Sequence, residues 1–303
     1  GFSTDVGPRG RLGWERHRVN QSGHKLGFDS EISKPRQNIS TWYQIPLAAP
    51  LTDYVRFSPG YQREELVDAD SRLINLGVQW HARLPSEWLR VISLRWEQED
   101  YDFGSGSKDG RSSFLVPGIG YSVLRSDSPL DPNQGYRLQW DVRGAKQDFI
   151  ADADVLHVTA LARGLVTFAD KHRLLGRAQI GAIGTNSYSK VPPSLRFFAG
   201  GDQSVRGYDY QTLSPRDAQG NREGGRYMFA GSLEYQYSIA ERWRVATFVD
   251  QGNAFNSLTD TMNTGVGFGL RWVSPVGPLR LDLAHALHED KGWRIHFSMG
   301  PEL

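Results

Sequence analysis

Apolar residues recur at every second position in segment after segment of this chain. The alternation is clear in RLINLGVQWHARL (72–84) and GYRLQWDVRG (135–144), and it returns in GVGFGLRW (265–272) and WRIHFSM (293–299). A period of two is typical of a β-strand that has one apolar and one polar face. The pattern therefore predicts an all-β protein.

The spacing of these segments predicts the architecture. Short turns such as 169–172, 240–243 and 274–277 alternate with longer loops such as 102–111 and 255–263. Short turns on one side, long loops on the other and an even number of strands are typical of an outer-membrane barrel. We therefore predict a 16-stranded antiparallel transmembrane β-barrel that forms a single domain, residues 1–303. Its expected strands are 1–7, 10–18, 24–33, 38–47, 53–65, 71–84, 88–102, 112–125, 135–147, 154–169, 172–184, 227–239, 243–255, 263–274, 277–288 and 292–302.

The composition favours a membrane barrel over a soluble β-sandwich, whose strands also alternate apolar and polar residues. The polar face is rich in Arg, Gln, Gly, Ser and His, where a soluble sheet more often carries Lys, Glu and Thr. The chain has 33 glycines and 9 tryptophans, and no apolar run of the length that a membrane-spanning helix needs. Aromatic residues near strand ends suit the girdles of a membrane barrel. These are Trp80, Trp88, Trp96, Trp243, Trp272 and Trp293.

Charge and cysteine content narrow the set of partners. The formal net charge is +1, from 35 basic and 34 acidic residues spread along the chain, so no basic stripe favours nucleic acid as a partner. The absence of cysteine excludes disulfides and thiolate metal sites and fits an exported protein. The opening residues, GFSTDVGPRG, do not resemble a signal peptide, and we expect the numbering to start inside a longer precursor.

Motifs of catalysis are absent from the sequence. It has neither a GxSxG nucleophile elbow nor an HExxH metal motif. His285 and His288 lie three apart, so on a strand they face opposite sides, and GSGSKDG (104–110) joins two strands rather than opening a helix. We predict no enzyme activity, no cofactor and no metal. A hydrolase with His296 or His157 as a base in the lumen is the enzymatic alternative.

The longest connection, about 185–226, exceeds the usual loop length and is therefore expected to be functional or disordered. Its segment FFAGGDQSVRGYDY (197–210) crowds aromatic residues around glycines, which argues against disorder. Arg206 is the single cation of that segment. We ask what such a loop is built to reach.

Five ordered motifs carry a resemblance to a known family. They are RFFAGGDQSVRGYDY (196–210), GSLEYQYSI (231–239), FVDQGNAF (248–255), SPVGPLRLDLA (274–284) and GPEL (300–303). Together they resemble the Omp85 superfamily of outer-membrane assembly and secretion barrels, and most closely its TamA branch. The resemblance implies that the sixth surface loop folds back into the lumen and places the arginine of its motif against the inner wall. The motif residues here are Val205, Arg206, Gly207 and Tyr208.

Alternation in the facing strands shows where that arginine can find partners. It turns Glu234 inward on one strand and Phe248 and Asp250 inward on the next. An unpaired charge in a confined site is costly, so we expect Arg206 to pair with both carboxylates and to rest on the phenyl ring. The alternative is a solvated loop arginine beside a carboxylate that lines a pore. Glycines leave room on the wall for the loop backbone: Gly265, Gly267 and Gly269.

The seam between the first and last strands is the second functional prediction. The first strand (1–7) is short because Pro8 follows it, and the last (292–302) contains Pro301, which cannot donate a backbone hydrogen bond. A short, weak closure could template an incoming strand and open sideways into the bilayer. The alternative is a closed barrel with a short first strand. The predicted seam residues are Phe2, Thr4, Val6, Ile295, Phe297 and Met299.

The resemblance implies a function in the outer membrane of a Gram-negative bacterium. It implies a factor that promotes insertion of unfolded outer-membrane proteins, including autotransporters, and acts on outer-membrane lipid. It further implies an inner-membrane-anchored periplasmic partner similar to TamB, and periplasmic POTRA domains ahead of the barrel, which are not found within 1–303. Two alternatives remain open. One is a TpsB-like two-partner secretion transporter that exports a soluble exoprotein through its pore, and the other is a passive porin.

Overall fold

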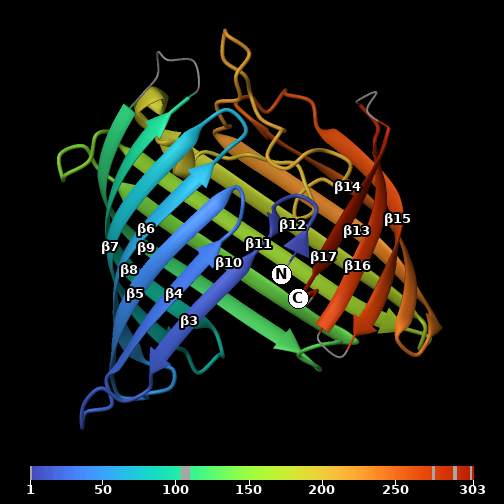
Figure 1. Cartoon of the computed structure of the whole chain (residues 1–303), viewed down its shortest axis with the longest axis horizontal. Coiled ribbons are helices and arrows are strands. Elements are labelled where there is room, and N and C mark those ends of the chain that lie inside the picture. Colours follow the sequence, from blue (N-terminus) through green and yellow to red (C-terminus); the bar gives the residue numbers. More distant parts are fainter. Residues whose placement is uncertain (1, 104–109, 275–276, 289–291, 301) are drawn as a thin grey trace.

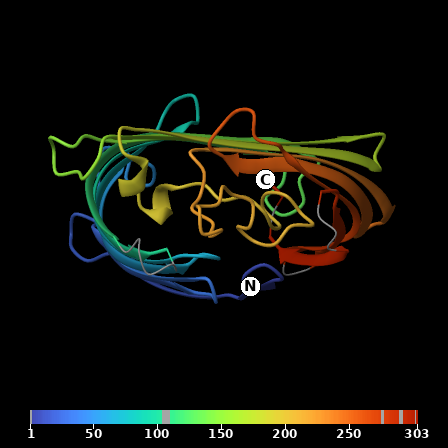
Figure 2. The ribbon, with the colours of Figure 1, turned by 90° about the horizontal axis from the view of Figure 1, so that it is seen from above.

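The computed structural model describes residues 2–103, 110–274, 277–288, 292–300 and 302–303. Within these residues, fifteen strands (β3–β17) form one sheet in which every strand pairs antiparallel with its neighbours in sequence. The sheet curls into a flattened barrel (Figures 1 and 2). The predicted all-β, antiparallel barrel fold is confirmed. No helix among the described residues is long and apolar enough to cross a membrane.

The strands lengthen toward the middle of the sheet. The first seven are β3 (Gly10–Arg16), β4 (Lys25–Ile32), β5 (Arg36–Pro46), β6 (Tyr54–Glu65), β7 (Asp70–Arg83), β8 (Leu89–Asp102) and β9 (Gly110–Ser126). The remaining eight are β10 (Gln134–Ala145), β11 (Val155–Phe168), β12 (His172–Thr185), β13 (Tyr227–Ala240), β14 (Trp243–Phe255), β15 (Asn263–Ser274), β16 (Gly277–Ala286) and β17 (Trp293–Met299).

The sequence alternation places apolar side chains on the outside of the sheet. Leu76 of β7 is 53% exposed and Leu233 of β13 is 51% exposed, whereas their polar neighbours point into the lumen. Such a surface is stable only against lipid, because so many exposed apolar side chains would otherwise contact water. The packed core of the molecule therefore lies inside the lumen.

The core is built by the long connection between β12 and β13, which crosses the interior of the barrel (Figure 2, yellow to orange). We call residues 186–226 the lumen loop. It contains two short 3₁₀ helices, η1 (Tyr188–Lys190) and η2 (Pro193–Leu195). Isolated bridges such as Phe197 with Gly225 and Ala199 with Leu213 fold the rest of it on itself.

The amino-terminal end differs from the prediction. Residues 1–7 were expected to form the first strand of the barrel, but β1 (Phe2–Ser3) and β2 (Gly7–Pro8) pair only with each other in a small hairpin. Gly7 has a φ of +69°, and Pro8 lacks an amide hydrogen, so the chain turns back where a strand would continue. The hairpin lies between β3 and β17, the two edges of the sheet (Figure 1).

The carboxyl-terminal end also differs. The last strand was expected to extend to 302, but β17 ends at Met299 and Glu302 turns inward, 2.8 Å from the Arg173 guanidinium. Gly300, with a φ of +147°, permits this turn. Pro301, the turn residues 275–276 and the 104–109 part of the predicted loop 102–111 lie outside the described residues.

Candidate functional site

A tight fold of the lumen loop positions Arg206. Gly200, Gly201 and Gly207 all adopt positive φ, and the Gly201 amide donates to the Val205 carbonyl oxygen. A Cβ at Gly207 would lie 2.9 Å from the Ala286 backbone nitrogen on β16. Only glycine combines the required φ with so close an approach to the wall, and the arginine is therefore pressed against it.

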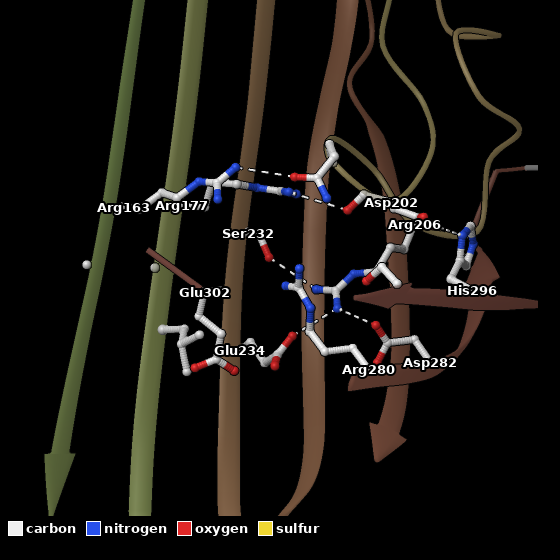
Figure 3. Close-up of a pocket in the computed structure, with 15 residues that line it drawn as sticks. Arg163, Arg177, Asp202, Arg206, Ser232, Glu234, Arg280, Asp282, His296 and Glu302 are labelled. Atoms are coloured by element: carbon white, nitrogen blue, oxygen red, sulfur yellow. Dashed lines mark hydrogen bonds and ion pairs between the residues drawn. The ribbon is translucent and has the colours of Figure 1, made fainter. Parts of the chain in front are cut away.

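Arg206 binds carboxylates from three strands. Its Nε and Nη2 atoms donate to the two oxygens of Asp250 on β14, at 2.7 and 2.9 Å. Its Nη1 atom donates to Glu234 on β13 at 2.9 Å and to Asp282 on β16 at 3.0 Å. Ser232 accepts from Nη2 at 3.2 Å (Figure 3). Arg206 is 6% exposed, and every nitrogen of its guanidinium has an acceptor.

An aromatic ring and a second arginine complete this cluster. The Arg206 guanidinium carbon lies 3.3 Å from the Phe248 ring centroid. Arg271 of β15 donates to Glu234 at 2.9 Å and forms an ion pair with Asp282 at 2.6 Å. Two arginines and three carboxylates thus share one buried site. We call Arg206, Glu234, Asp250, Arg271 and Asp282 the arginine–carboxylate cluster.

Charge balance keeps the cluster ionised. Burial alone lowers the pKa of Arg206, but the Asp250 carboxylate beside it outweighs burial, and the pKa lies well above its ordinary value. The guanidinium therefore remains a cation at every physiological pH. The cluster can act as a fixed electrostatic clamp between loop and wall, but Arg206 has no titration near neutral pH for acid–base chemistry.

The sequence had placed Arg206, Glu234, Phe248 and Asp250 together, and the structure brings them into contact. It adds Asp282 and Arg271, which were not predicted as site residues. A signal for Asp282 was present in PLRLDLA (278–284), where alternation with leucines turns the carboxylate inward.

Two other motif residues, Val205 and Tyr208, contribute apolar packing. Val205 and Tyr208 are fully buried in an apolar cluster with Ala199, Leu213 and Ala286. The Tyr208 hydroxyl donates to a backbone carbonyl oxygen of β15 at 3.4 Å. The motif therefore combines one charged contact with apolar anchors on both sides of it.

His296 of β17 forms a second contact between loop and wall. Its Nε2 accepts the Gly207 amide at 3.0 Å, and its Nδ1 lies 2.5 Å from an Asp202 oxygen and 3.6 Å from an Asp5 oxygen. Because Nε2 accepts, Nδ1 carries a proton and donates to Asp202. Burial raises the pKa of Asp5, although its hydrogen bond with His296 opposes that effect.

This histidine and the two aspartates resemble a metal site, since their ligand atoms lie within 4.8 Å of one another. A metal on Nδ1 requires the proton on Nε2, where it would meet the Gly207 amide. The donor set therefore does not fit a metal while the loop is docked. We interpret Asp5, Asp202, Gly207 and His296 as a latch that joins the hairpin, the lumen loop and β17.

The opposite end of the lumen loop is anchored by aromatic stacking. The Arg196 guanidinium lies 4.6 Å from the Phe103 ring centroid and 4.5 Å from that of Tyr188, and it donates to three backbone carbonyls. Burial lowers the pKa of Arg196 and raises that of Tyr188 to about 12. Glu99 of β8 binds the Ser194 amide at 3.2 Å. The loop is thus fixed at two places, around Arg196 and at Arg206.

The predicted seam residues lie on both sides of the hairpin contact. The Thr4 amide donates to the Phe297 carbonyl oxygen at 3.4 Å, and the Phe297 amide donates to the Thr4 hydroxyl at 3.2 Å. Ile295 is 62% exposed, and Met299 also faces outward. Val6 lies in the turn of the hairpin, between β1 and β2.

Sequence comparisons identify the family. A family model described as "Omp85 superfamily domain" matches residues 12–302, and this chain belongs to that superfamily of outer-membrane β-barrel proteins. Among curated proteins, the outer membrane protein assembly factor BamA of Nitratidesulfovibrio vulgaris is 36% identical over 93% of this chain and 35% of its own length. BamA of Neisseria meningitidis is 22% identical over 84% of this chain and 35% of its own length. The chain spans about a third of these relatives.

Solved structures agree with the fold. BamA from Haemophilus ducreyi lacking POTRA domains 1–3 superposes with a TM-score of 0.84 at 14% identity, over 98% of this chain and 68% of that one. CdiB from Acinetobacter baumannii gives 0.60 at 16% identity, over 97% and 57%. The chain is accordingly an integral protein of the Gram-negative outer membrane. The TamA branch stays a prediction, because the curated relatives described above carry the name BamA.

Proposed function

We propose that this barrel promotes the insertion of unfolded outer-membrane proteins by opening between its amino-terminal hairpin and β17. Two curated relatives are named as assembly factors, which supports this class of function. An incoming strand could add to an exposed sheet edge through main-chain hydrogen bonds and enter the bilayer without exposing its amides to lipid.

The weakness of the seam is the observation that carries the proposal. Neighbouring strands such as β11 and β12 pair over their whole lengths, Val155–Phe168 with His172–Thr185. At the seam, the hairpin forms no ladder with β17 among the described residues. Thr4 and Phe297 exchange two hydrogen bonds there, one of them through a side chain, and Asp5 lies 3.6 Å from His296. Since each such bond contributes about 1 kcal/mol, separating the hairpin from β17 costs far less than separating two paired strands of the sheet.

The finer assignment is to the TamA branch. The motifs SPVGPLRLDLA (274–284) and GPEL (300–303) favour it over the two-partner secretion transporters. On this proposal the barrel works with a TamB-like inner-membrane-anchored partner, takes autotransporters among its clients and contacts outer-membrane lipid. Deleting the TamB-like partner should then abolish client assembly by this barrel. Normal assembly without that partner would contradict the finer assignment alone.

A disulfide lock across the seam tests the proposal. The chain has no cysteine, so pairs can be introduced without background. Thr4→Cys would be combined with Ile295→Cys, Phe297→Cys or Met299→Cys in the protein carrying the periplasmic domains that the family resemblance implies. Autotransporter assembly in cells is then measured under oxidising and reducing conditions. We expect oxidation of the pair Thr4→Cys and Phe297→Cys to stop assembly, and reduction of that disulfide to restore it.

The matched control is a lock between strands that stay together. Leu138→Cys with Ala162→Cys joins directly opposed positions of β10 and β11 and should leave assembly unchanged. If the locked seam also assembles clients at the normal rate, lateral opening is wrong for this barrel. Export of a soluble protein through the pore would then be the better explanation.

A further inference from the structure

Arginines face one another across three neighbouring strands of the inner wall. In the strand registers, Arg137 of β10 is opposite Arg163 of β11, and Arg163 is opposite Arg177 of β12. Like charges directly opposite each other destabilise a sheet. Arg177 is attracted by Asp250 and repelled by Arg206, by Arg163 and by Arg280 of β16. This part of the wall therefore concentrates positive charge.

Arg163, Arg177 and Arg280 form no ion pair with a carboxylate among the described residues. Arg163 donates to the side-chain oxygen of Gln203, and Arg177 donates to backbone carbonyls of Asp202 and Ser204. Arg280, in the part of the chain that the structure describes, has no hydrogen bond or ion pair through its side chain, and its buried Nε is unsatisfied. Half-buried guanidinium groups without an anion are costly.

The carboxylates nearby are already bound to other groups. Glu234 and Asp282 belong to the arginine–carboxylate cluster, and Asp202 belongs to the latch. Glu302 binds Arg173 and the Gln236 amide, each at 2.8 Å. These contacts leave Arg163, Arg177 and Arg280 to be neutralised by something else.

A small cavity lies between these arginines. Its volume is about 50 Å³, and Arg163, Arg177 and Arg280 line it together with Arg206 and the already bound carboxylates described above (Figure 3). About 10–15 Å³ suffices for one water molecule, so the cavity has room for a few waters or for one small oxyanion. Guanidinium forks match the oxygens of phosphate geometrically and electrostatically.

We propose that Arg163, Arg177 and Arg280 form a binding site for an oxyanion of the phosphate class, either free phosphate or the phosphate of a lipid headgroup. The bound anion neutralises the wall of β11, β12 and β16 beside the docked lumen loop. Because Gln203, Asp202 and Ser204 of that loop contact two of the arginines, binding also stabilises the docked loop.

Thermal unfolding of the purified chain in detergent tests the site. Sodium phosphate is compared with sodium chloride at equal ionic strength, so that general screening cancels. We expect phosphate to raise the unfolding temperature saturably. Arg280→Gln should weaken the apparent affinity for phosphate about ten-fold or more, because it removes charge-assisted hydrogen bonds. Without phosphate, the variant should unfold at the same or a higher temperature, because a repulsion is removed.

Two further variants keep the test decisive. Arg95→Gln removes an inward arginine of β8 that is paired with Glu97 at 3.2 Å, and should leave the phosphate response unchanged. Arg163→Gln removes another arginine of the cavity and should weaken the phosphate response in the same way. It therefore replaces Arg280→Gln if that variant does not fold. A phosphate response that persists in both cavity variants would show that phosphate acts elsewhere and would overturn the proposal.

The source of the anion is distinguished in lipid nanodiscs. If phosphate alone gives the response, free phosphate is the ligand. If only discs containing phosphatidylglycerol stabilise the protein relative to phosphatidylcholine discs, and Arg280→Gln abolishes this effect, the ligand is a lipid headgroup. If neither phosphate nor phosphatidylglycerol exceeds chloride and phosphatidylcholine, no such site exists.

Discussion

Arg206 shows how one residue can hold a long loop inside a barrel. Its guanidinium meets carboxylates that belong to β13, β14 and β16, so one side chain joins three strands to the loop. Buried ion pairs add little stability when compared with apolar packing, but removing one partner leaves uncompensated charge. The site therefore specifies where the loop lies more than it strengthens the fold.

Arg206→Ala should destabilise the protein by about 3–5 kcal/mol, because Asp250, Glu234 and Asp282 would lose their shared cation. Arg206→Lys should recover only part of this, since an ammonium cannot bind both Asp250 oxygens in a fork. Urea unfolding in detergent measures both effects. Arg111→Ala, at an exposed ion pair, is the control and should change stability little. Equal losses for the two arginines would contradict the buried cluster.

The charged half of this site could be predicted from the sequence because strand alternation fixes which side chains point inward. That argument reached Glu234, Phe248 and Asp250, and extended to β16 it would have reached Asp282. The contact of Gly207 with His296 could not be predicted in this way. It depends on the loop conformation, which positive φ angles at several glycines determine and no periodicity reveals.

At the scale of elements, the lumen loop and β15 meet with no side chain between them. A Cβ at Gly265 would lie 1.9 Å from the Arg206 carbonyl oxygen, which no relaxation of a flexible side chain can relieve. The loop backbone therefore rests directly on the wall. The glycines of GVGFGLRW (265–272) predicted room for the loop, although not which glycine it occupies.

Gly265→Ala should undock the motif end of the lumen loop. We expect trypsin to cleave the variant at Arg216 or Arg222 several-fold faster than the parent protein, with the barrel strands still intact. Gly176→Ala is the matched control, because a Cβ at that strand position meets no atom within 4 Å. Unchanged cleavage of the Gly265 variant would mean that the aromatic anchors around Arg196 suffice to hold the loop.

Seen as a whole, the barrel was largely predictable and its closure was not. Alternation and turn spacing gave the order and approximate bounds of β3–β17, since each strand is specified locally by its apolar face. The hairpin of residues 2–8 carries no such pattern. Its position depends on contacts of Ser3, Thr4 and Asp5 with residues some 200 or more positions away, which a local reading cannot supply.

Asp5 should govern how firmly the hairpin closes the seam. Its carboxylate accepts the Asp202 amide at 2.5 Å, so Asp5→Ala should raise hydrogen exchange of residues 2–8 about ten-fold. Burial raises the pKa of Asp5 in the folded protein. The stability that Asp5 gives to the closed hairpin is therefore complete at pH values below the pKa of Asp5 in the unfolded chain. It is lost as the pH rises through the pKa of Asp5 in the folded protein. Protection of the hairpin in the parent protein should fall correspondingly with rising pH.

Asp148→Ala, in an exposed turn, provides the comparison and should leave exchange of the hairpin as it is. Mass spectrometry after deuterium labelling at several pH values measures both variants. Identical exchange in Asp5→Ala and in the parent would show that the seam stays shut without Asp5, through contacts such as those between Thr4 and Phe297.

The distribution of the loop's contacts has a mechanical consequence. The arginine–carboxylate cluster ties the lumen loop to β13–β16, whereas Arg222 and Ser194 tie it to Asp68 and Glu99 in the amino-terminal half. The loop therefore forms a crossbar between the two halves of the sheet. If the seam parts, we expect this crossbar to limit how far the edges separate, so that movement is confined to the hairpin and the strands beside it.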